Sequence, residues 1–200
     1  MRIIAGAAGG RRLVAPKGDE VRPTADRVKE ALFSSLQPQL PGAHVLDLFA
    51  GSGALGLEAL SRGAAAVTLV ERGRAAIAAI ETNIATVDLP GVELVRADVR
   101  SAVGGLLPGA PFDLVLIDPP YALDDAGLAT LLQALVGHLA AEATVVVERG
   151  SRSAAPEWPP DLLPTEPRRY GDTTLHRADR RDERSGATSA PEPSGEREQG

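Results

Sequence analysis

The chain of 200 residues contains no cysteine, which excludes disulfide bridges and cysteine-ligated zinc or iron–sulfur sites. Histidine is also scarce. His44, His138 and His176 lie far apart and show no spacing typical of metal ligands, so we expect no metal site.

Long apolar runs are absent as well. Ala126–Ala141, the longest uncharged run in the second half of the chain, is shorter than the roughly 20 residues that span a bilayer. Near the N-terminus, Arg11 and Arg12 interrupt the apolar stretch before it could form a signal core. We therefore expect a cytoplasmic protein that does not bind a membrane.

The formal net charge is −6, which weighs against a nucleic-acid partner, but the charges are unevenly distributed. Residues 1–40 carry seven Arg and Lys against four Asp and Glu, whereas residues 178–200 carry four Arg against six Asp and Glu. Residues 178–200 also lack Val, Ile, Leu, Met and aromatic side chains, so they predict a disordered tail. Part of the acidity therefore lies outside the expected folded unit.

Short apolar runs alternate with segments of helical periodicity. The predicted strands are His44–Phe49, Ala66–Glu71, Val92–Ala97, Asp113–Ile117 and Ala143–Glu148. The predicted helices are Thr24–Leu36, with Thr24 as its N-cap, Ser52–Arg62, Arg74–Val87 and Leu123–Leu139. This alternation predicts an α/β fold, a mostly parallel sheet with helices on both faces.

The segments outside this core are less regular. Residues 2–15 predict a hairpin that turns at Gly9–Gly10. Pro156–Pro167 predicts an irregular connection, and Arg168–Arg177 a final hairpin or edge strands. We divide the chain into an N-terminal hairpin and helix (1–40), a core (41–177) and a tail (178–200).

A glycine-rich loop follows the first predicted strand. Gly51, Gly53 and Gly56 have the spacing G-x-G-x-x-G, and Glu71 ends the next strand. Such a loop lets a ligand approach the backbone and the helix N-terminus, and an acid at Glu71 can accept hydrogen bonds from ribose hydroxyls. The pattern alone fits a dinucleotide enzyme as well as a methyltransferase.

Asp47 separates these two interpretations. It lies four residues before Gly51, where its charge would repel a pyrophosphate. S-adenosylmethionine has no phosphate and carries an ammonium and a sulfonium, which a carboxylate favours. Asp98, after the third strand, is placed to accept a hydrogen bond from an adenine amine, although a solvated loop acid is an equal interpretation.

The fourth strand ends in Asp118-Pro119-Pro120-Tyr121. The two prolines hold the turn rigidly and donate no hydrogen bond, which makes the turn rich in acceptors. Acceptors that bind both N–H groups of an aromatic amine localise the nitrogen lone pair and stabilise the charge that develops on attack. Tyr121 offers a ring on which an unstacked base can lie.

The tetrad resembles the amino-methyltransferases that act on adenine N6, cytosine N4 or guanine N2. The blocks RIIAG (residues 2–6), GRRL (10–13), RPTADRVKEALF (22–33) and LDLFAGSGALGLEALSRG (46–63) are similar to the bacterial RsmD family, over residues 2 to about 177. That family methylates guanine N2 in 16S ribosomal RNA with S-adenosylmethionine on a Rossmann-like class I methyltransferase fold.

The resemblance implies roles for individual residues. The cofactor site would comprise Thr24, Asp47, Phe49, Gly51, Ser52, Gly53, Glu71, Arg72 and Asp98. The catalytic residues would be Asp118, Pro119, Pro120 and Tyr121, and the residues that bind RNA would be Arg11, Arg12, Arg22 and Arg27.

Three alternatives stay open at this stage. An adenine-N6 methyltransferase would share the tetrad. A nicotinamide-dependent oxidoreductase would explain the glycine loop and Glu71, but not Asp47 or Asp118. A non-catalytic RNA-binding protein with a methyltransferase fold would not need the intact tetrad. The sequence does not distinguish naked RNA from a small-subunit particle as the substrate.

Overall fold

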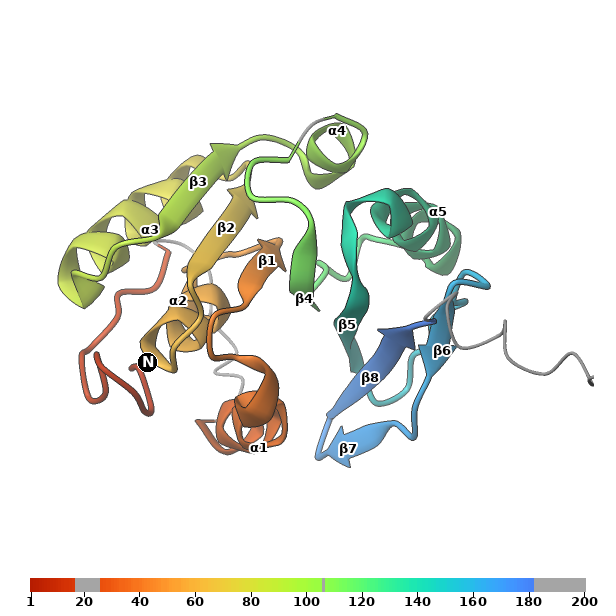
Figure 1. Cartoon of the computed structure of the whole chain (residues 1–200), viewed down its shortest axis with the longest axis horizontal. Coiled ribbons are helices and arrows are strands. Elements are labelled where there is room, and N and C mark those ends of the chain that lie inside the picture. Colours follow the sequence, from red (N-terminus) through yellow and green to blue (C-terminus); the bar gives the residue numbers. More distant parts are fainter. Residues whose placement is uncertain (17–25, 106, 182–200) are drawn as a thin grey trace, which may run out of the picture.

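The computed structural model describes residues 1–16, 26–105 and 107–181, and it has the α/β architecture that the sequence predicts (Figure 1). The strands form one mixed sheet in the order β3-β2-β1-β4-β5-β8-β6, and β7 pairs with β8. The strands are β1 (His44–Leu48), β2 (Ala66–Glu71), β3 (Val92–Arg96), β4 (Phe112–Ile117), β5 (Leu139–Gly150), β6 (Leu162–Pro164), β7 (Arg168–Tyr170) and β8 (Thr173–Arg180). Strands β1 to β5 pair in parallel, whereas β6, β7 and β5 pair antiparallel with β8.

Helices cover both faces of this sheet. They are α1 (Asp26–Leu36), α2 (Ala54–Ser61), α3 (Arg74–Val87), α4 (Val99–Val103) and α5 (Asp125–Leu135), with short 3-10 helices η1 (Gln37–Gln39) and η2 (Val136–His138). Successive residues of a strand face opposite sides, so Val45 packs in one core cluster with α1, α2 and α3. Leu46 packs in another with α4 and α5. The central strands are therefore apolar on both faces, as their continuous apolar runs predict.

The predicted N-terminal hairpin forms only at its base. An antiparallel bridge joins Arg2 to Arg12, with backbone hydrogen bonds from Ile3 N to the Arg11 carbonyl at 3.0 Å and from Leu13 N to the Met1 carbonyl at 3.1 Å. The backbone N–H groups of Ile4 and Ala5 donate instead to the carboxylate of Glu58 on α2, at 2.7 and 3.1 Å. Because these donors are bound by Glu58, the chain leaves the antiparallel pairing after Ile3 and is held against α2.

Glu58 also holds two cations at this junction. Its fully buried carboxylate lies 3.2 Å from Lys29 Nζ of α1 and 2.7 Å from Arg62 Nε at the end of α2. The ammonium of Lys29 donates in turn to the Arg2 carbonyl. A single buried carboxylate therefore joins the N-terminal segment, α1 and α2, which the sequence did not reveal.

Several element bounds differ from the predicted ones. The helix predicted to run to Leu139 ends at Leu135 and continues as η2. The short helix α4 and the short strand β6, inside the proline-rich connection, were not predicted.

The predicted tail begins too early. Strand β8 runs to Arg180, and Ala178 is buried and pairs with Val145. Residues 178–180 thus belong to the fold, and residues 182–200 lie outside the described part. The expected final hairpin is confirmed as β7 and β8. The N-cap predicted at Thr24 lies outside the described residues.

Candidate active site

The glycine loop connects β1 to α2 at the carboxyl end of the sheet. Phe49 and Gly51 have φ angles of 60° and 57°, in the left-handed region. Glycine adopts such a φ angle without steric strain, whereas a non-glycine residue such as Phe49 is strained by on the order of 1–3 kcal/mol. Strained residues of this kind cluster at functional sites. A Cβ placed on Gly51 would meet only the Phe49 carbonyl, at 3.9 Å, so the space beside Gly51 is open.

Gly56 has a different task from Gly51. A Cβ on Gly56 would lie 2.4 Å from Leu69 Cδ2 and 2.7 Å from Val67 Cγ1, so only glycine lets α2 pack this closely on β2. Gly51 therefore leaves open space beside the loop, and Gly56 allows close packing of α2 on β2.

Asp47 lies beneath this loop, with 1% of its surface exposed. Its Oδ2 accepts a hydrogen bond from the Gly56 N–H at 2.8 Å. The pKa of Asp47 is raised to about 7, mainly by burial, which the Gly56 hydrogen bond opposes in part and the charges of Asp118 and Glu71 reinforce. Three carboxylates therefore converge at the carboxyl ends of β1, β2 and β4, a place that favours a cation.

Glu71 binds the glycine loop directly. Its Oε2 accepts from Gly51 N at 2.9 Å, and its Oε1 accepts from Arg72 N and Gly73 N at 2.8 and 2.7 Å. A carboxylate offers about four acceptor positions, so little capacity remains for the two ribose hydroxyls assigned to it from the sequence. Contact with a ribose stays a prediction, and holding the loop is a second role that the sequence did not indicate.

Asp98 and Arg72 come together as an exposed ion pair. Arg72 Nη1 lies 2.9 Å from Asp98 Oδ2, and the other carboxylate oxygen of Asp98 caps α4 through Arg100 N at 3.0 Å. The structure thus brings two of the predicted cofactor residues into contact, one directly after β2 and the other just after β3. Their contact with a cofactor stays a prediction.

Asn83 is a site-supporting residue that sequence analysis missed. It is fully buried on α3, and its Nδ2 donates to the carbonyls of Ser52 and Val14 at 2.8 and 2.9 Å. Its Oδ1 accepts from Val14 N at 2.8 Å. The signal was an asparagine within the apolar stripe of α3, between Ile80 and Val87, and its partners lie 31 and 69 residues away.

The tetrad leaves the carboxyl end of β4 as a turn, closed by a hydrogen bond from Leu123 N to the Pro120 carbonyl at 2.9 Å. Asp118 is accessible to solvent, yet enough protein surrounds its carboxyl group for desolvation to raise its pKa to about 6. Its carboxylate makes no hydrogen bond within the part of the chain that the structure describes. Tyr121 is 81% exposed.

The predicted RNA-binding arginines have mixed outcomes. Arg11 Nη1 donates to the Thr86 carbonyl at 2.7 Å and to that of Val87, so it caps the end of α3. Arg12 and Arg27 are exposed, and Arg22 lies outside the described residues. Contact with RNA stays a prediction for all four, and Arg11 has a structural role besides.

Residues 1–16, 26–105 and 107–181 contain no group of three or more histidine, aspartate or glutamate side chains that could hold a metal ion. Within the same ranges, no helix has the length and apolar character needed to cross a membrane.

Comparison with known proteins adds independent information. Residues 1–178 match the family model described as Conserved hypothetical protein 95. The chain is 40% identical over 159 residues to Ribosomal RNA small subunit methyltransferase D of Escherichia coli K12, across 80% of this chain and 79% of that protein. A protein of the same name from Haemophilus influenzae is 36% identical over 150 residues, across 74% and 78%.

A solved structure agrees with these matches. The Escherichia coli protein yhhF is 36% identical, with a TM-score of 0.78, across 90% of this chain and 97% of that one. Together with the family model, these relatives settle the family that the sequence blocks indicated. This chain belongs to the Conserved hypothetical protein 95 family, which is the RsmD family.

Proposed function

We propose that this protein transfers a methyl group from S-adenosylmethionine to the exocyclic N2 amine of a guanine in 16S ribosomal RNA. Two relatives that cover most of the chain are named as methyltransferases of small-subunit ribosomal RNA, which supports the substrate class. The choice of guanine N2 rests on the resemblance to the RsmD family and on the chemistry of the tetrad.

The adjacency of two loops carries this proposal. Strands β1 and β4 are parallel neighbours, and Leu48 is opposite Ile117 at their carboxyl ends. The glycine loop and the turn that begins at Asp118 therefore leave the sheet side by side. A cofactor bound by the first and an amine bound by the second would meet at this edge.

The residues of the glycine loop fit a positively charged cofactor. Without a cation, the buried Asp47 carboxyl has a pKa of about 7 and is half protonated near neutral pH. A ligand with an ammonium or sulfonium would favour its charged form, whereas a pyrophosphate would meet three carboxylates. When bound, S-adenosylmethionine supplies an electrophilic methyl group on its sulfonium.

Asp118 is suited to the target amine. With a pKa of about 6 it is mostly ionised at pH 7, and its carboxylate can accept hydrogen bonds from the amine. These bonds stabilise the positive charge that develops on nitrogen as the N–C bond forms and the S–C bond breaks. The nitrogen then releases one proton, which Asp118 can accept and pass to water.

Guanine matches a carboxylate acceptor better than adenine does. Guanine presents N1–H and N2–H as adjacent donors, and one carboxylate can accept from both. Adenine presents a bare N1, whose lone pair the Asp118 carboxylate would repel.

The test is to incubate the protein with labelled S-adenosylmethionine and either naked 16S ribosomal RNA or small-subunit particles, and to identify the methylated nucleoside by mass spectrometry. We expect N2-methylguanosine from at least one of the two substrates. N6-methyladenosine would show that the base is wrong, and no methylation of either substrate would overturn the proposed function. Calorimetry should show binding of S-adenosylhomocysteine but not of NAD, which separates the oxidoreductase alternative.

A further inference from the structure

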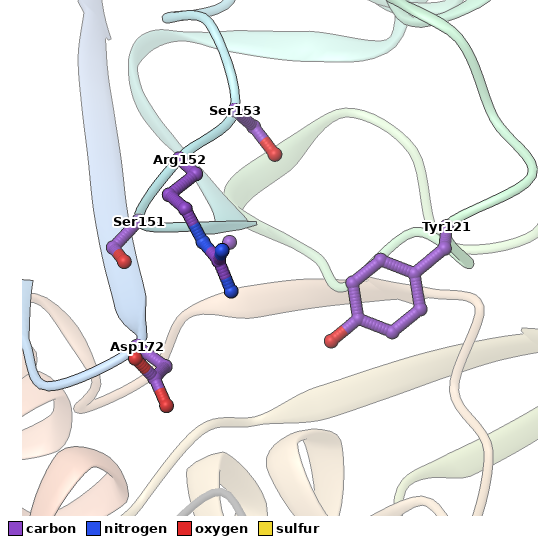
Figure 2. A pocket seen from close by; sticks show the side chains of 6 residues that line it. Tyr121, Ser151, Arg152, Ser153 and Asp172 are labelled. Atoms are coloured by element: carbon purple, nitrogen blue, oxygen red, sulfur yellow. The ribbon is translucent and has the colours of Figure 1, made fainter.

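A depression of about 310 Å³ lies beside Tyr121, on the side of the tetrad away from the glycine loop. Its lining residues are Tyr121, Gly150, Ser151, Arg152, Ser153 and Asp172. Figure 2 shows the Tyr121 ring at one side of this depression, with Arg152 and Asp172 across from it. The far wall belongs to the segment after β5 and to the β7–β8 turn.

This wall is held by backbone hydrogen bonds. Ser151 N donates to the Asp172 carbonyl at 2.8 Å, and Ser153 N donates to the Gly150 carbonyl at 2.9 Å. Arg169 adds a side-chain bond from Nη2 to Ser151 Oγ at 3.3 Å. The segment that carries Arg152 is therefore fixed to the end of the sheet before any ligand arrives.

The hydrogen-bond donors of this wall suit an anion. Arg152 is exposed and makes no hydrogen bond or ion pair with any residue in the described ranges. Arg149, by contrast, has a side chain that is only 12% exposed and lies 2.6 Å from Asp125. Two hydroxyls, on Ser151 and Ser153, line the depression as further donors, and Asp172 is its one acidic lining residue.

A phosphate of the substrate strand matches this set of groups. A guanine that stacks on Tyr121 must leave its neighbours, and its flanking phosphates then lie beside the ring. Arginine and serine side chains are common phosphate donors in nucleic-acid complexes, where they position the strand without reading its sequence. On the other side of Tyr121, the carboxylates of Asp47 and Glu71 beside the glycine loop would repel a phosphate.

We propose that Arg152, with the Ser151 and Ser153 hydroxyls, binds a phosphate of the RNA strand that flanks the target guanine. This inference rests on the proposed function and adds a binding site to it. It also predicts that the strand crosses the β5–β8 end of the sheet, rather than only the N-terminal segment that the charge distribution suggested.

The test compares Arg152→Ala with Arg181→Ala by measuring the affinity for 16S ribosomal RNA between 50 and 200 mM salt. Arg181 is an exposed arginine just after β8, and because β8 is antiparallel to β5 it lies at the opposite end of these strands from Arg152. Its replacement by alanine changes the net charge by the same amount as Arg152→Ala. Each lost phosphate contact lowers the slope of log affinity against log salt by about 0.7–0.9. The ratio of wild-type to Arg152→Ala affinity should therefore shrink about threefold across this range, while Arg181→Ala keeps the wild-type slope.

Arg152→Lys should recover most of the slope, because a lysine keeps the charge, and the affinity for S-adenosylhomocysteine should be unchanged in each variant. If the wild type methylates 16S ribosomal RNA and Arg152→Ala binds it like Arg181→Ala, this inference is wrong and the proposed function stands. If the wild type methylates no ribosomal RNA, the proposed function fails and this inference falls with it.

Discussion

At the scale of single residues, Asp47 couples proton binding to cofactor binding. Its pKa is about 7 without a ligand, and a bound cation lowers that pKa. Binding therefore releases a proton below pH 7, and the affinity for S-adenosylhomocysteine, which keeps the ammonium, should rise from pH 6 to pH 8. The rise should be at most about tenfold per pH unit below the pKa and level off above it. Calorimetry in buffers of different ionisation enthalpy measures both the affinity and the released proton.

Asp47→Asn is the control for this pH dependence. Its side-chain oxygen can still accept from Gly56, but it does not titrate, so its affinity should vary little between pH 6 and 8. The free protein should respond to pH in the opposite sense. An unfolded aspartate has a pKa of about 3.9, so the raised pKa of Asp47 costs stability as pH rises from about 4 to 7. If the affinity of the wild type for S-adenosylhomocysteine were equal at pH 6 and 8, or higher at pH 6, Asp47 would not couple proton binding to cofactor binding.

Tyr121 should act through its ring. Stacking of a base on an aromatic side chain is worth roughly 1–3 kcal/mol, so Tyr121→Ala should lower kcat/KM for RNA by about 5- to 150-fold. Tyr121→Phe keeps the ring and should stay within a few-fold of the wild type. Steady-state kinetics of the two variants measure the difference. Equal damage from both substitutions would mean that the hydroxyl is required and that stacking is not the main role.

At the scale of elements, the junction of the N-terminal segment, α1 and α2 depends on Glu58. Removing one partner of a buried ion cluster leaves an uncompensated charge and typically costs about 3–5 kcal/mol. Glu58→Ala should lower the free energy of unfolding by this order, because Lys29 and Arg62 lose the carboxylate that balances their charge and Ile4 N loses its acceptor. Denaturant titration measures the loss.

Glu81→Ala is the matched control for Glu58. Glu81 forms an ion pair with Arg96 at 2.6 Å, but both side chains are more than half exposed, and such pairs contribute little. Its unfolding midpoint should stay close to the wild type. If Glu58→Ala were as stable as Glu81→Ala, the cluster would not hold the junction.

The bounds of the helices and strands show how much of the fold local sequence patterns predict. The bounds of β2 and α3 were predicted to the residue, because an apolar run and a helical stripe are each bounded by sharp changes in the sequence. Helix α4 was missed because five residues are too few to show a period. Strand β6 was missed because proline disfavours strands except at edges, and β6 is at the edge of the sheet.

The features of the site that the sequence did not predict are mostly contacts between residues far apart in the sequence. The glycine loop, Asp47 and the tetrad were found because each has a local pattern. The bonds from Glu71 to Gly51 and from Asn83 to Ser52 join residues 20 and 31 apart, and no local pattern contains them. Only the folded chain shows that Glu71 and Asn83 hold the loop.

At the scale of the whole molecule, the order of the strands arranges the proposed chemistry along one edge of the sheet. Strands β1 and β2 carry Asp47 and Glu71, proposed for the cofactor, near their carboxyl ends, and they precede β4 and β5 in the sheet order β2-β1-β4-β5 (Figure 1). The turn after β4 carries the acceptor for the amine, and the segment after β5 carries Arg152. The turn with Tyr121 thus lies between the strands that carry Asp47 and Glu71 and the segment that carries Arg152. This separation explains how a chain with a net charge of −6 can offer a local site for a phosphate.

The central claim is that Asp118 acts on the target amine and not on the cofactor, and one pair of measurements on Asp118→Ala tests it most directly. Losing an acceptor that stabilises developing charge should lower the rate of methyl transfer to 16S ribosomal RNA on the order of a hundredfold or more. The affinity for S-adenosylhomocysteine should be nearly unchanged, because removing Asp118 lowers the pKa of Asp47, and this offsets the loss of one carboxylate near the cation. Near-normal methyl transfer by Asp118→Ala, or a loss of rate explained entirely by lost cofactor affinity, would contradict the claim.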